Sequence, residues 1–330
     1  MFFSRRERLM MEPQKILEVK SLCKYFKTNN VVNKAVDMVD FSIAKGEVLG
    51  LVGETGSGKT TIGRLILHLL KASSGKIFYN GNDISHIRGA ALKNLRRQMQ
   101  IIFQDPYSSL DPRMKIFSTL TMPMKALGMF KGKETDRAEY LLDLVGISSS
   151  ALNRYPHEFS GGQRQRIGIA RALAVDPEFI VADEAVSALD VSIQAQVLNL
   201  LKDLQEKFHL TSLFITHDLS VVHYMCDRVV VLYMGRIMEI ASCKTIFENR
   251  LHPYSDSLIN AIPIPDPEKE AQKELNIPDN YFEESYEIPE KGCLFHPRCP
   301  KRFEKCKTQT PQLINAGNDH GVACFLYEKG

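Results

Sequence analysis

The residues most clearly suited to chemistry form a glycine-rich segment, GETGSGKT, at Gly53–Thr60. An apolar run at Val48–Val52 precedes it, which is typical of a strand buried on both faces, and a helical pattern opens at Thr60. Glycines let backbone N–H groups turn toward phosphate oxygens, and the start of a helix adds partial positive charge. The pattern therefore predicts a nucleotide phosphate site rather than a glycine-rich turn with a surface lysine.

Two side chains of this segment suit phosphate and metal binding. Lys59 is expected to reach the β- and γ-phosphates, and the Thr60 hydroxyl is expected to hold Mg²⁺. The residues expected to contact the nucleotide in this segment are Gly53, Glu54, Thr55, Gly56, Ser57, Gly58, Lys59, Thr60 and Thr61.

Polar residues that suit hydrolysis follow two more strand patterns. The apolar run at Phe179–Ala182 ends in Asp183 and Glu184. An aspartate there can hold the water shell of Mg²⁺, and the next glutamate can take a proton from an attacking water. His217 lies at the exit of the pattern at Thr211–Thr216, and it is expected to contact the γ-phosphate rather than to be an ordinary loop residue.

Gln104 is the fourth polar residue of this kind. It ends the strand pattern QIIFQ and precedes a turn signal at Asp105 and Pro106. Parallel sheets bind ligands at the carboxyl ends of their strands, so the Gln104 amide is expected beside the phosphates. The predicted magnesium site consists of Thr60, Gln104 and Asp183.

A second candidate anion site is FSGGQ at Phe159–Gln163. Ser160 is a good helix N-cap, and Gln163–Ala174 has apolar residues at helical spacing. Gly161 and Gly162 leave the backbone bare at this helix N-terminus, which suits an anion. Taken alone, the pattern is also that of an ordinary capped helix.

The order of these motifs resembles that of the ATP-binding subunits of ABC transporters. The resemblance implies an α/β fold: a P-loop ATPase core of ABC type with a small antiparallel β subdomain and an inserted helical subdomain. It also implies a head-to-tail dimer, with ATP between the phosphate loop of one subunit and the signature of the other. The matching residues are Gly53–Thr60, Gln104, Ser160–Gln163, Asp183–Glu184, Ser187–Asp190 and His217.

The resemblance also implies roles for single residues. Gln104 would sense the γ-phosphate and the metal, Glu184 would position and deprotonate water, and His217 would stabilise the transition state. Lys59 completes the set expected to be catalytic, so ATP hydrolysis is the predicted activity. The signature residues expected to act on the partner's nucleotide are Ser160, Gly161, Gly162 and Gln163.

A small antiparallel subdomain is expected to hold the adenine. Residues 16–47 and 76–83 have the pattern of short strands and turns, with a hairpin signal at Asn80–Gly81. Phe26 occupies the position of the adenine-stacking aromatic residue in the family pattern, and Tyr25 is the alternative. Phe26 is therefore placed among the nucleotide contacts.

Three further segments complete the expected core. Residues 105–158 are mainly helical in pattern, and in the family this insert grips a cytoplasmic helix of the permease. Pro106–Met124 is then either the docking face or part of a generic helical insert. Val191–Phe208 is predicted to be an amphipathic helix, and Asp227–Glu239 a closing strand hairpin.

Longer stretches are similar to the ATPase subunits of oligopeptide and dipeptide importers, and within them to the second, F-type, of two paralogous subunits. They are Asn153–Leu173, Val186–Leu201, His252–Tyr254 and Ala261–Pro267. The resemblance implies a paralogous ATPase partner, two permease subunits, an extracytoplasmic peptide-binding protein and a place at the cytoplasmic face of the membrane. Import of nickel or another small solute, and a soluble non-transport ABC ATPase, are the alternatives.

Two positions depart from the pattern of the resembling family. Phe159 replaces the leucine of the broader family, but the peptide-importer subgroup commonly has phenylalanine there. Ala185 follows Glu184 where the family usually has proline. The change is expected to loosen the turn behind the catalytic glutamate without removing any chemistry. Because no catalytic position is altered, the site is expected to hydrolyse ATP rather than to be silent.

Composition supports a soluble core with appended segments. The chain has 330 residues, 44% of them apolar, and no apolar run approaches the roughly 18 residues that span a membrane. A net charge of +3 with scattered basic residues gives no reason to expect nucleic acid. The predicted divisions are a tail (1–14), an ABC ATPase domain (15–262) with its helical subdomain (105–158), a proline- and acid-rich linker (263–291) and a Cys-rich extension (292–330).

Four of the seven cysteines lie in the Cys-rich extension, at spacing C-x5-C-x6-C-x17-C. Soft thiolates select Zn²⁺ or an iron–sulfur cluster, and the missing C-x2-C knuckle counts against a zinc ribbon. In the resembling subunits such a quartet is associated with a [4Fe–4S] cluster, so a cluster is favoured, with zinc or no metal as alternatives. The predicted ligands are Cys293, Cys299, Cys306 and Cys324.

Other thiols and imidazoles are given simpler assignments. Cys23, Cys226 and Cys243 lie in core patterns and are expected to be inert packing thiols. His296 and His320 could replace a cysteine as ligands, but they are interpreted as surface histidines.

Overall fold

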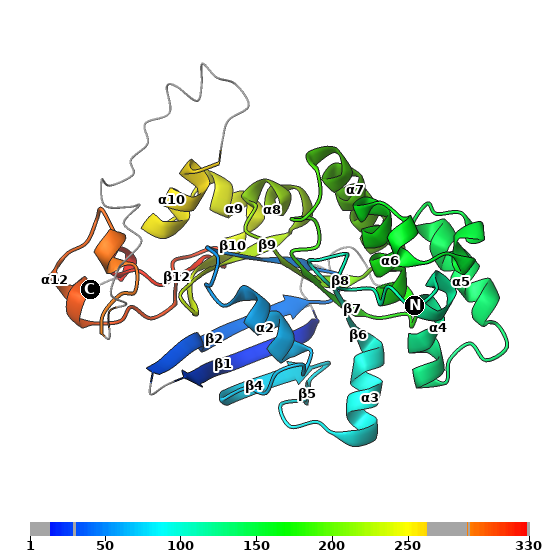
Figure 1. Cartoon of the computed structure of the whole chain (residues 1–330). Coiled ribbons are helices and arrows are strands. Elements are labelled where there is room, and N and C mark those ends of the chain that lie inside the picture. Colours follow the sequence, from blue (N-terminus) through cyan, green and yellow to red (C-terminus); the bar gives the residue numbers. More distant parts are fainter. Residues whose placement is uncertain (1–13, 29–30, 263–288, 290, 329–330) are drawn as a thin grey trace, which may run out of the picture.

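The computed structural model describes residues 14–28, 31–262, 289 and 291–328 (Figure 1). The predicted N-terminal tail and nearly all of the predicted linker therefore lie outside the described residues. Within the described ranges, no helix is long and apolar enough to cross a membrane.

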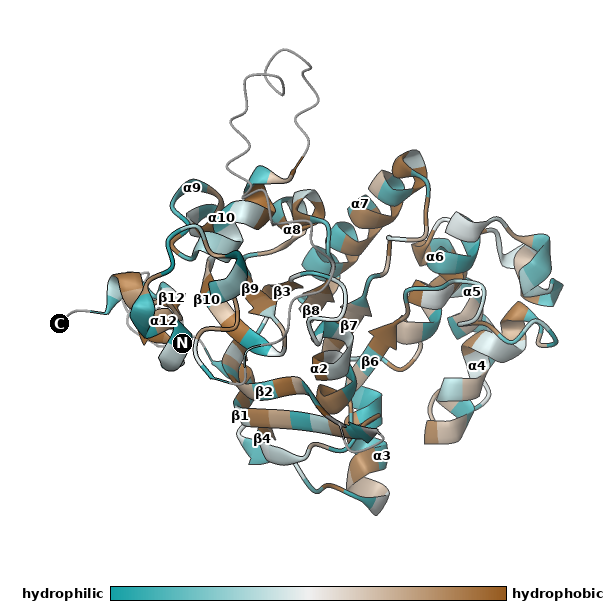
Figure 2. Ribbon diagram, turned by 60° about the vertical axis from the view of Figure 1, so that its left-hand side comes forward, coloured by the Kyte–Doolittle hydropathy of each residue, from teal (hydrophilic) through white to brown (hydrophobic). Residues whose placement is uncertain are grey.

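The centre of the molecule is a sheet in which the strands next to β3 run parallel to it. All five residues of β3 and of β7 are buried, as their unbroken apolar runs predict. Figure 2 shows the hydrophobic character of these inner strands. In sheet order the strands are β11 (Ile314–Asn315), β12 (Gly321–Val322), β10 (Arg236–Ser242), β9 (Arg228–Tyr233), β3 (Val48–Val52), β8 (Thr211–Ile215), β7 (Phe179–Asp183) and β6 (Met99–Ile102).

The second sheet is antiparallel and contains two strands that are much longer than expected. β1 and β2 have 14 residues each, and shifts in their register interrupt the alternation of the two faces. This irregularity explains why the sequence pattern suggested only short strands. In order the strands are β2 (Val31–Ala44), β1 (Lys15–Thr28), β4 (Ser74–Tyr79) and β5 (Asn82–Asp83).

Helices cover both faces of the large sheet. Figure 1 shows α2 and the small sheet on one side, α8 to α10 on the other, and α4 to α6 at one end. Val191–Phe208 forms one helix, as predicted. The helices are α2 (Lys59–Ile66), α3 (Gly89–Gln98), α4 (Ile116–Leu127), α5 (Glu134–Leu144), α6 (Gly161–Leu173), α7 (Val191–Phe208), α8 (Leu219–Met225), α9 (Cys243–Glu248), α10 (Pro253–Asn260) and α12 (Glu304–Thr308), with short 3-10 turns η1 (Ser149–Asn153), η2 (Pro156–Glu158), η3 (His296–Arg298) and η4 (Phe325–Tyr327).

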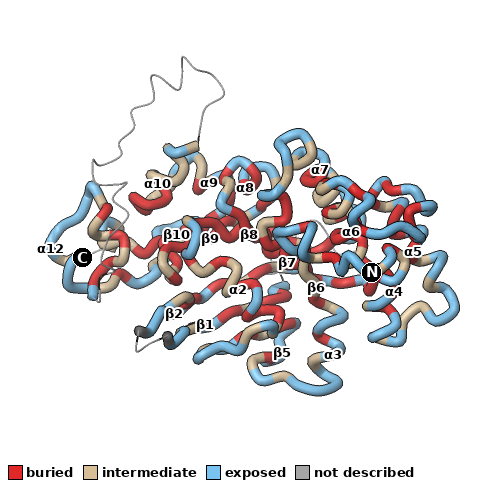
Figure 3. The backbone as a smooth tube through the Cα atoms, in the orientation of Figure 1, coloured by how far each residue is buried: buried red, intermediate tan, exposed pale blue. Residues whose placement is uncertain are grey.

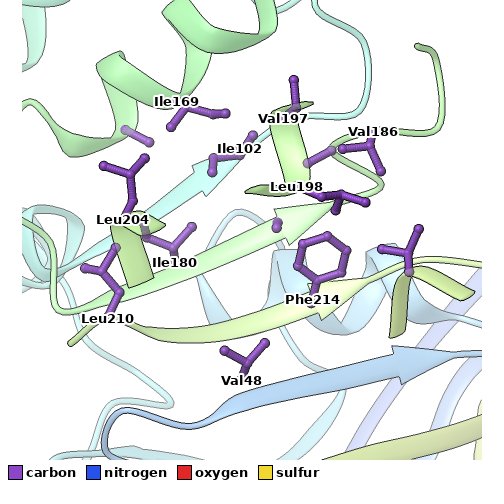
Figure 4. Close-up of a cluster of buried hydrophobic side chains, with 14 of the residues drawn as sticks. Val48, Ile102, Ile169, Ile180, Val186, Val197, Leu198, Leu204, Leu210 and Phe214 are labelled. Atoms are coloured by element: carbon purple, nitrogen blue, oxygen red, sulfur yellow. The ribbon is translucent and has the colours of Figure 1, made fainter. Parts of the chain in front are cut away.

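Alternate residues of the inner strands divide the core into two clusters. Val48 and Val52 of β3 pack with the cluster that contains α6 and α7, part of which is drawn in Figure 4. Leu49 and Leu51 pack on the opposite face with α2 and the small sheet. Figure 3 shows that this buried centre runs along the inner strands β7 to β10, so both sheets and the helices form one body around β3.

The Cys-rich segment joins the large sheet at its edge. β12 pairs antiparallel with β10, and β11 pairs with β12. The side chains of Cys293, Phe295 and Cys306 belong to the buried cluster of the core. The segment is therefore continuous with the core around β3 rather than packed on its own.

Candidate functional site

The phosphate loop, Gly53–Gly58, connects β3 to α2 and lies against the backbone of two other strands. Gly58 has φ +103°, and a Cβ there would approach the Ala35 carbonyl oxygen of β2 to 2.1 Å. A Cβ on Gly53 would approach the Leu232 carbonyl oxygen of β9 to 2.0 Å. Only glycine fits at these two positions, so the loop has a fixed back wall. A Cβ on Gly56 would meet nothing within 4 Å, which leaves the opposite side of the loop open.

Lys59 is held inside this loop. Its side chain is buried, and Nζ donates to the carbonyl oxygens of Gly53 at 2.7 Å and Glu54 at 2.8 Å. Burial lowers the pKa of Lys59, although the nearby carboxylates of Glu184, Asp183 and Glu54 oppose the shift. An anionic ligand at this point would favour the charged ammonium, so the site suits phosphate.

Residues predicted at the carboxyl ends of four adjacent strands lie together. Thr60 Oγ1, after β3, donates to Asp183 Oδ1 of β7 at 2.9 Å. Gln104 Nε2 donates to Glu184 Oε2 at 2.8 Å, and His217 Nδ1, after β8, lies 3.5 Å from Glu184 Oε1. The strand β6 ends at Ile102, so Gln104 reaches this cluster from the following loop.

Asp183 is the most buried carboxyl group of this cluster, with 5% of its surface exposed. Burial raises the pKa of Asp183, and it outweighs the hydrogen bond from Thr60 and the charges of Arg64 and Lys59. A divalent cation would reverse that balance, because it favours the ionised carboxylate. Asp183 and Thr60 together can therefore hold a metal ion.

The backbone around Glu184 is held by several hydrogen bonds. Its N–H donates to the Ile215 carbonyl of β8 at 2.9 Å, and its φ of +48° lies in the left-handed region. The Ser187 hydroxyl donates to the Glu184 carbonyl at 3.0 Å, and Gln165 Nε2 donates to the Ala185 carbonyl at 2.7 Å. The turn that includes Ala185 is thus fixed on both sides, with the Glu184 carboxylate directed at Gln104 and His217.

The signature segment begins α6 as expected. Ser160 Oγ accepts from the Gln163 N–H at 3.3 Å, and Gln163 Oε1 accepts from the Ser160 N–H at 3.1 Å, which forms a capping box. A Cβ on Gly162 would approach Ile193 Cγ2 to 2.3 Å, whereas one on Gly161 would meet nothing closer than 3.8 Å. In the described part of the chain, no hydrogen bond or ion pair joins this segment to the phosphate loop.

The two aromatic candidates for adenine stacking differ in their partners. The Tyr25 hydroxyl donates to Asp37 Oδ1 at 2.6 Å, and Asp37 also pairs with Arg236 at 2.6 Å. The Phe26 ring is 38% exposed and lies 5.0 Å from Lys24 Nζ. The structure therefore leaves Phe26 as the ring with open surface.

The four predicted cysteine ligands line one small cavity, together with His252, His296 and Phe295 among others. Burial raises the pKa of Cys293 and Cys324 to about 11, and it also raises that of Cys299. Four converging thiols suit a group with soft metal ions. Across the described ranges, however, no three Cys, His, Asp or Glu side chains are grouped so that they could enclose a single ion.

The interpretation of both histidines as surface residues was wrong for His320. This side chain is 4% exposed, and its Nε2 lies 2.6 Å from Glu239 Oε1 of β10. Glu239 also accepts the backbone N–H groups of Leu251 and His252. The buried Glu239 carboxylate draws His320 inward, so the Cys-rich segment is fastened to the sheet. His296 is partly exposed and lines the cysteine cavity.

Sequence reasoning also missed two residues that hold the phosphate loop from outside. Arg298 forms a bidentate ion pair with Glu54, and the Tyr254 hydroxyl accepts from the Glu54 N–H at 3.0 Å. Tyr254 belongs to a motif noted only as a resemblance, and Arg298 precedes Cys299. The only sequence feature that could have pointed to Arg298 was its position directly before Cys299, a predicted ligand.

Two family models match the chain. Residues 36–187 match the ABC transporter family, and residues 238–306 match the C-terminal region of oligopeptide/dipeptide transporters. The oligopeptide transport ATP-binding protein AppF of Bacillus subtilis strain 168 is 47% identical over 323 residues, which cover 94% of this chain and 97% of that protein. OppF of the same organism, also named an oligopeptide transport ATP-binding protein, is 53% identical over 264 residues, with 79% and 86% covered.

A solved structure of the dimeric ATP-binding cassette MJ0796, bound to ADP and Pi, has a TM-score of 0.63 and 28% identity. The match covers 69% of this chain and 98% of that one. It confirms the predicted fold class, an ABC-type P-loop core with an antiparallel β subdomain and a helical insert. By its sequence, its fold and the arrangement of its motifs, the chain belongs to the ATP-binding subunits of ABC transporters, in the oligopeptide/dipeptide transporter family.

Proposed function

We propose that this chain binds and hydrolyses ATP to drive uptake of oligopeptides or dipeptides through a membrane transporter. One observation carries the ATPase assignment: Thr60, Gln104, Asp183, Glu184 and His217 meet at the carboxyl ends of four adjacent strands, beside a buried lysine. The names of the relatives support peptides as the cargo.

In this proposal the phosphate loop and Lys59 bind the phosphates of ATP, and Phe26 stacks on adenine. Thr60, Asp183 and Gln104 would hold Mg²⁺, which would supply positive charge beside the γ-phosphate. The raised pKa of Asp183 and the lowered pKa of Lys59 fit these assignments, because each group is buried where an ion of opposite charge would bind.

Glu184 acts as the general base. Its carboxylate lies beside Gln104 and His217, the two other polar side chains that would face the γ-phosphate. Gln104 orients the attacking water and the metal, and His217 stabilises charge on the γ-phosphate in the transition state. Ile215 and Ser187 fix the backbone of Glu184, which keeps the base in place.

The proposal includes a paralogous ATPase subunit, two permease subunits and a binding protein as partners. Ser160, Gly161, Gly162 and Gln163 contact the nucleotide held by a paralogous ATPase subunit. Two permease subunits dock on the helical insert, where Tyr107 and Met122 are 62% and 53% exposed. An extracytoplasmic binding protein delivers the peptide, and this chain sits at the cytoplasmic face of the membrane.

Cys293, Cys299, Cys306 and Cys324 hold a [4Fe–4S] cluster. Four cysteine side chains line one cavity, and cysteine thiolates are the ligands of iron–sulfur clusters. The cluster would supply structural cross-linking or redox sensing.

The decisive experiment compares wild-type protein with Glu184→Gln in ATP binding and turnover. ATP binding is expected to persist in Glu184→Gln while turnover falls roughly 10²–10⁴-fold, because only the base is lost. Near-wild-type hydrolysis would refute the base assignment. In liposomes containing the full transporter, peptide-loaded binding protein should stimulate ATPase activity, and stimulation by a nickel complex alone would refute peptide cargo.

A further inference from the structure

The Cys-rich segment makes a direct contact with the phosphate loop. Arg298 Nη1 and Nη2 donate to Glu54 Oε2 and Oε1, both at 2.9 Å, across 244 residues of sequence. The Arg298 side chain is 10% exposed and that of Glu54 is 38% exposed. A bidentate pair of this kind fixes the orientation of both groups as well as their charge.

Aromatic rings hold the guanidinium group of Arg298 in place. Its central carbon lies 5.8 Å from the ring centroids of both Tyr233 and Phe295. Tyr254 packs against these two rings, at centroid distances of 4.6 and 5.3 Å. Because this packing orders the arginine, little further side-chain entropy is lost when it pairs with Glu54.

Glu54 connects this support to the phosphate-binding lysine. Its N–H donates to the Tyr254 hydroxyl at 3.0 Å, and its carbonyl oxygen accepts from Lys59 Nζ at 2.8 Å and from the Ser57 N–H at 3.1 Å. Without Arg298, the Glu54 carboxylate would put an unbalanced negative charge beside the phosphates of ATP. Arg298 therefore both orients the loop and neutralises that charge.

The same arginine is adjacent to the cysteine cavity. Arg298 ends the short turn η3 and immediately precedes Cys299, while Phe295 lies just before the turn. Cys299 and Phe295 both line the cavity with the other three cysteines. A change in the packing of the cavity would shift Phe295 or Cys299, and with them Arg298. The ion pair between Arg298 and Glu54 would then change.

We propose that Arg298 is a positioning residue for the phosphate loop, and that through it the packing of the cysteine cavity sets the affinity of the loop for ATP. The inference rests on the proposed function, because it takes Gly53–Thr61 to be the ATP site. It gives the Cys-rich segment a role within each ATP-binding event.

The test is a double-mutant cycle read as the Kd for ATP by calorimetry, in full-length Glu184→Gln protein so that no turnover occurs. Arg298→Gln should weaken ATP binding about 10-fold, because Glu54 is left unpaired. In a Glu54→Gln background the same change should cost less than about 2-fold. Arg302→Gln is the matched control: this exposed arginine of the same segment bonds the Pro297 carbonyl and does not reach the loop.

Each outcome of this cycle decides the inference. Arg298→Gln with unchanged ATP affinity, or with the same loss in both backgrounds, overturns it. Arg298→Lys keeps the positive charge but cannot form the bidentate pair. Its Kd for ATP should lie between those of the parent protein and Arg298→Gln. Urea unfolding of each variant separates a local effect from loss of the fold. A parent protein that fails to bind ATP would refute the proposed function instead.

The cavity is tested by Cys299→Ser in the same assay. The change should weaken ATP binding several-fold when Arg298 is present, and it should add nothing in the Arg298→Gln background, since the two then act through one contact. An equal loss in both backgrounds would overturn transmission through Arg298, and no loss would overturn any transmission from the cavity.

Discussion

The N-termini of α2 and α6 are both glycine-rich and both suited to anions, but they differ in the contacts that surround them. At α2, Gly53 and Gly58 lie against backbone oxygens of other strands, and Lys59 is buried in the loop. At α6, Ser160 and Gln163 cap their own helix, and a Cβ on Gly161 would make only ordinary contacts, the nearest with Leu189 at 3.8 Å. The α2 terminus is packed against other strands and contains a buried lysine, whereas the α6 terminus has its own capping contacts around Gly161.

Under the proposed function, this difference means that the chain carries half of one ATP site at α2 and the complementary half of another at α6. The loop at α2 encloses Lys59 and has Thr60, Asp183 and Glu184 beside it, so the isolated chain is expected to bind ATP. At α6 the guanidinium of Arg164 donates to the Phe159 carbonyl, so this terminus gains little from an anion unless a partner supplies the remaining contacts. Variants at the two termini should therefore behave differently, as follows from the largest effect to the smallest.

Lys59→Met should have the largest effect on ATP binding by the isolated chain. The Kd is expected to rise about 100-fold, because a charge-assisted contact in a desolvated loop is lost. Ser160→Ala, at the other terminus, should leave the Kd within about 2-fold. Calorimetry on both variants checks the comparison, and a comparable loss of affinity in Ser160→Ala would break it.

Substitutions at Gly161 and Gly162, the adjacent glycines of the signature, should distinguish an effect on packing from an effect on ATP turnover. Gly162→Ala is expected to destabilise the fold by about 1–3 kcal/mol, because the new methyl overlaps Ile193. Gly161→Ala brings its methyl only into ordinary contact, 3.8 Å from the Leu189 side chain, and should not lower stability, yet ATP turnover by the assembled transporter should fall about 10-fold. Urea unfolding and an ATPase assay measure the two effects. Normal turnover in Gly161→Ala would mean that nothing approaches this backbone.

A smaller, pH-dependent effect is expected at Asp183. Its pKa is raised in the folded protein, so its contribution favours folding below the unfolded pKa of about 3.9 and is lost as pH rises through the folded pKa. In EDTA at pH 7, Asp183→Asn should therefore be more stable than wild type, by about 1 kcal/mol, and this advantage should vanish at acid pH.

Magnesium should reverse the Asp183 comparison at neutral pH. With Mg²⁺ and ATP, wild type should gain stability that Asp183→Asn does not, because only the carboxylate favours the cation. Urea unfolding at pH 4 and pH 7, with and without Mg²⁺–ATP, measures both parts. A variant that is less stable than wild type in EDTA at every pH would contradict the raised pKa.

Much of the fold and of the phosphate site could be predicted from the sequence, because those features are local. The unbroken apolar runs at Val48–Val52 and Phe179–Ala182 identified inner strands, and the 3.6-residue period identified Val191–Phe208 as a helix. Gln104 was expected at this edge because parallel sheets bind ligands at the carboxyl ends of their strands, and His217 was expected beside the phosphates from the order of the motifs. Both side chains lie beside the Glu184 carboxylate.

The features that were missed depend on pairing between distant residues. Glu54 and Arg298 are separated by 244 residues, and neither has a periodic pattern that points to the other. His320 follows Asn318 and Asp319, a composition typical of an exposed turn, but Glu239 of β10 pairs with it in the interior. The length of β1 and β2 was hidden because register shifts break their alternation.

The most direct test of a shared ATP site is ATP-dependent association of the Glu184→Gln protein, alone and mixed with the proposed paralogous ATPase subunit, by sedimentation velocity. A complex should form only with ATP, and Ser160→Arg should abolish it while the isolated chain keeps its Kd for ATP. The arginine would block the α6 terminus without touching the phosphate loop. A complex that forms without ATP or survives Ser160→Arg, or no complex in either mixture, would contradict the account.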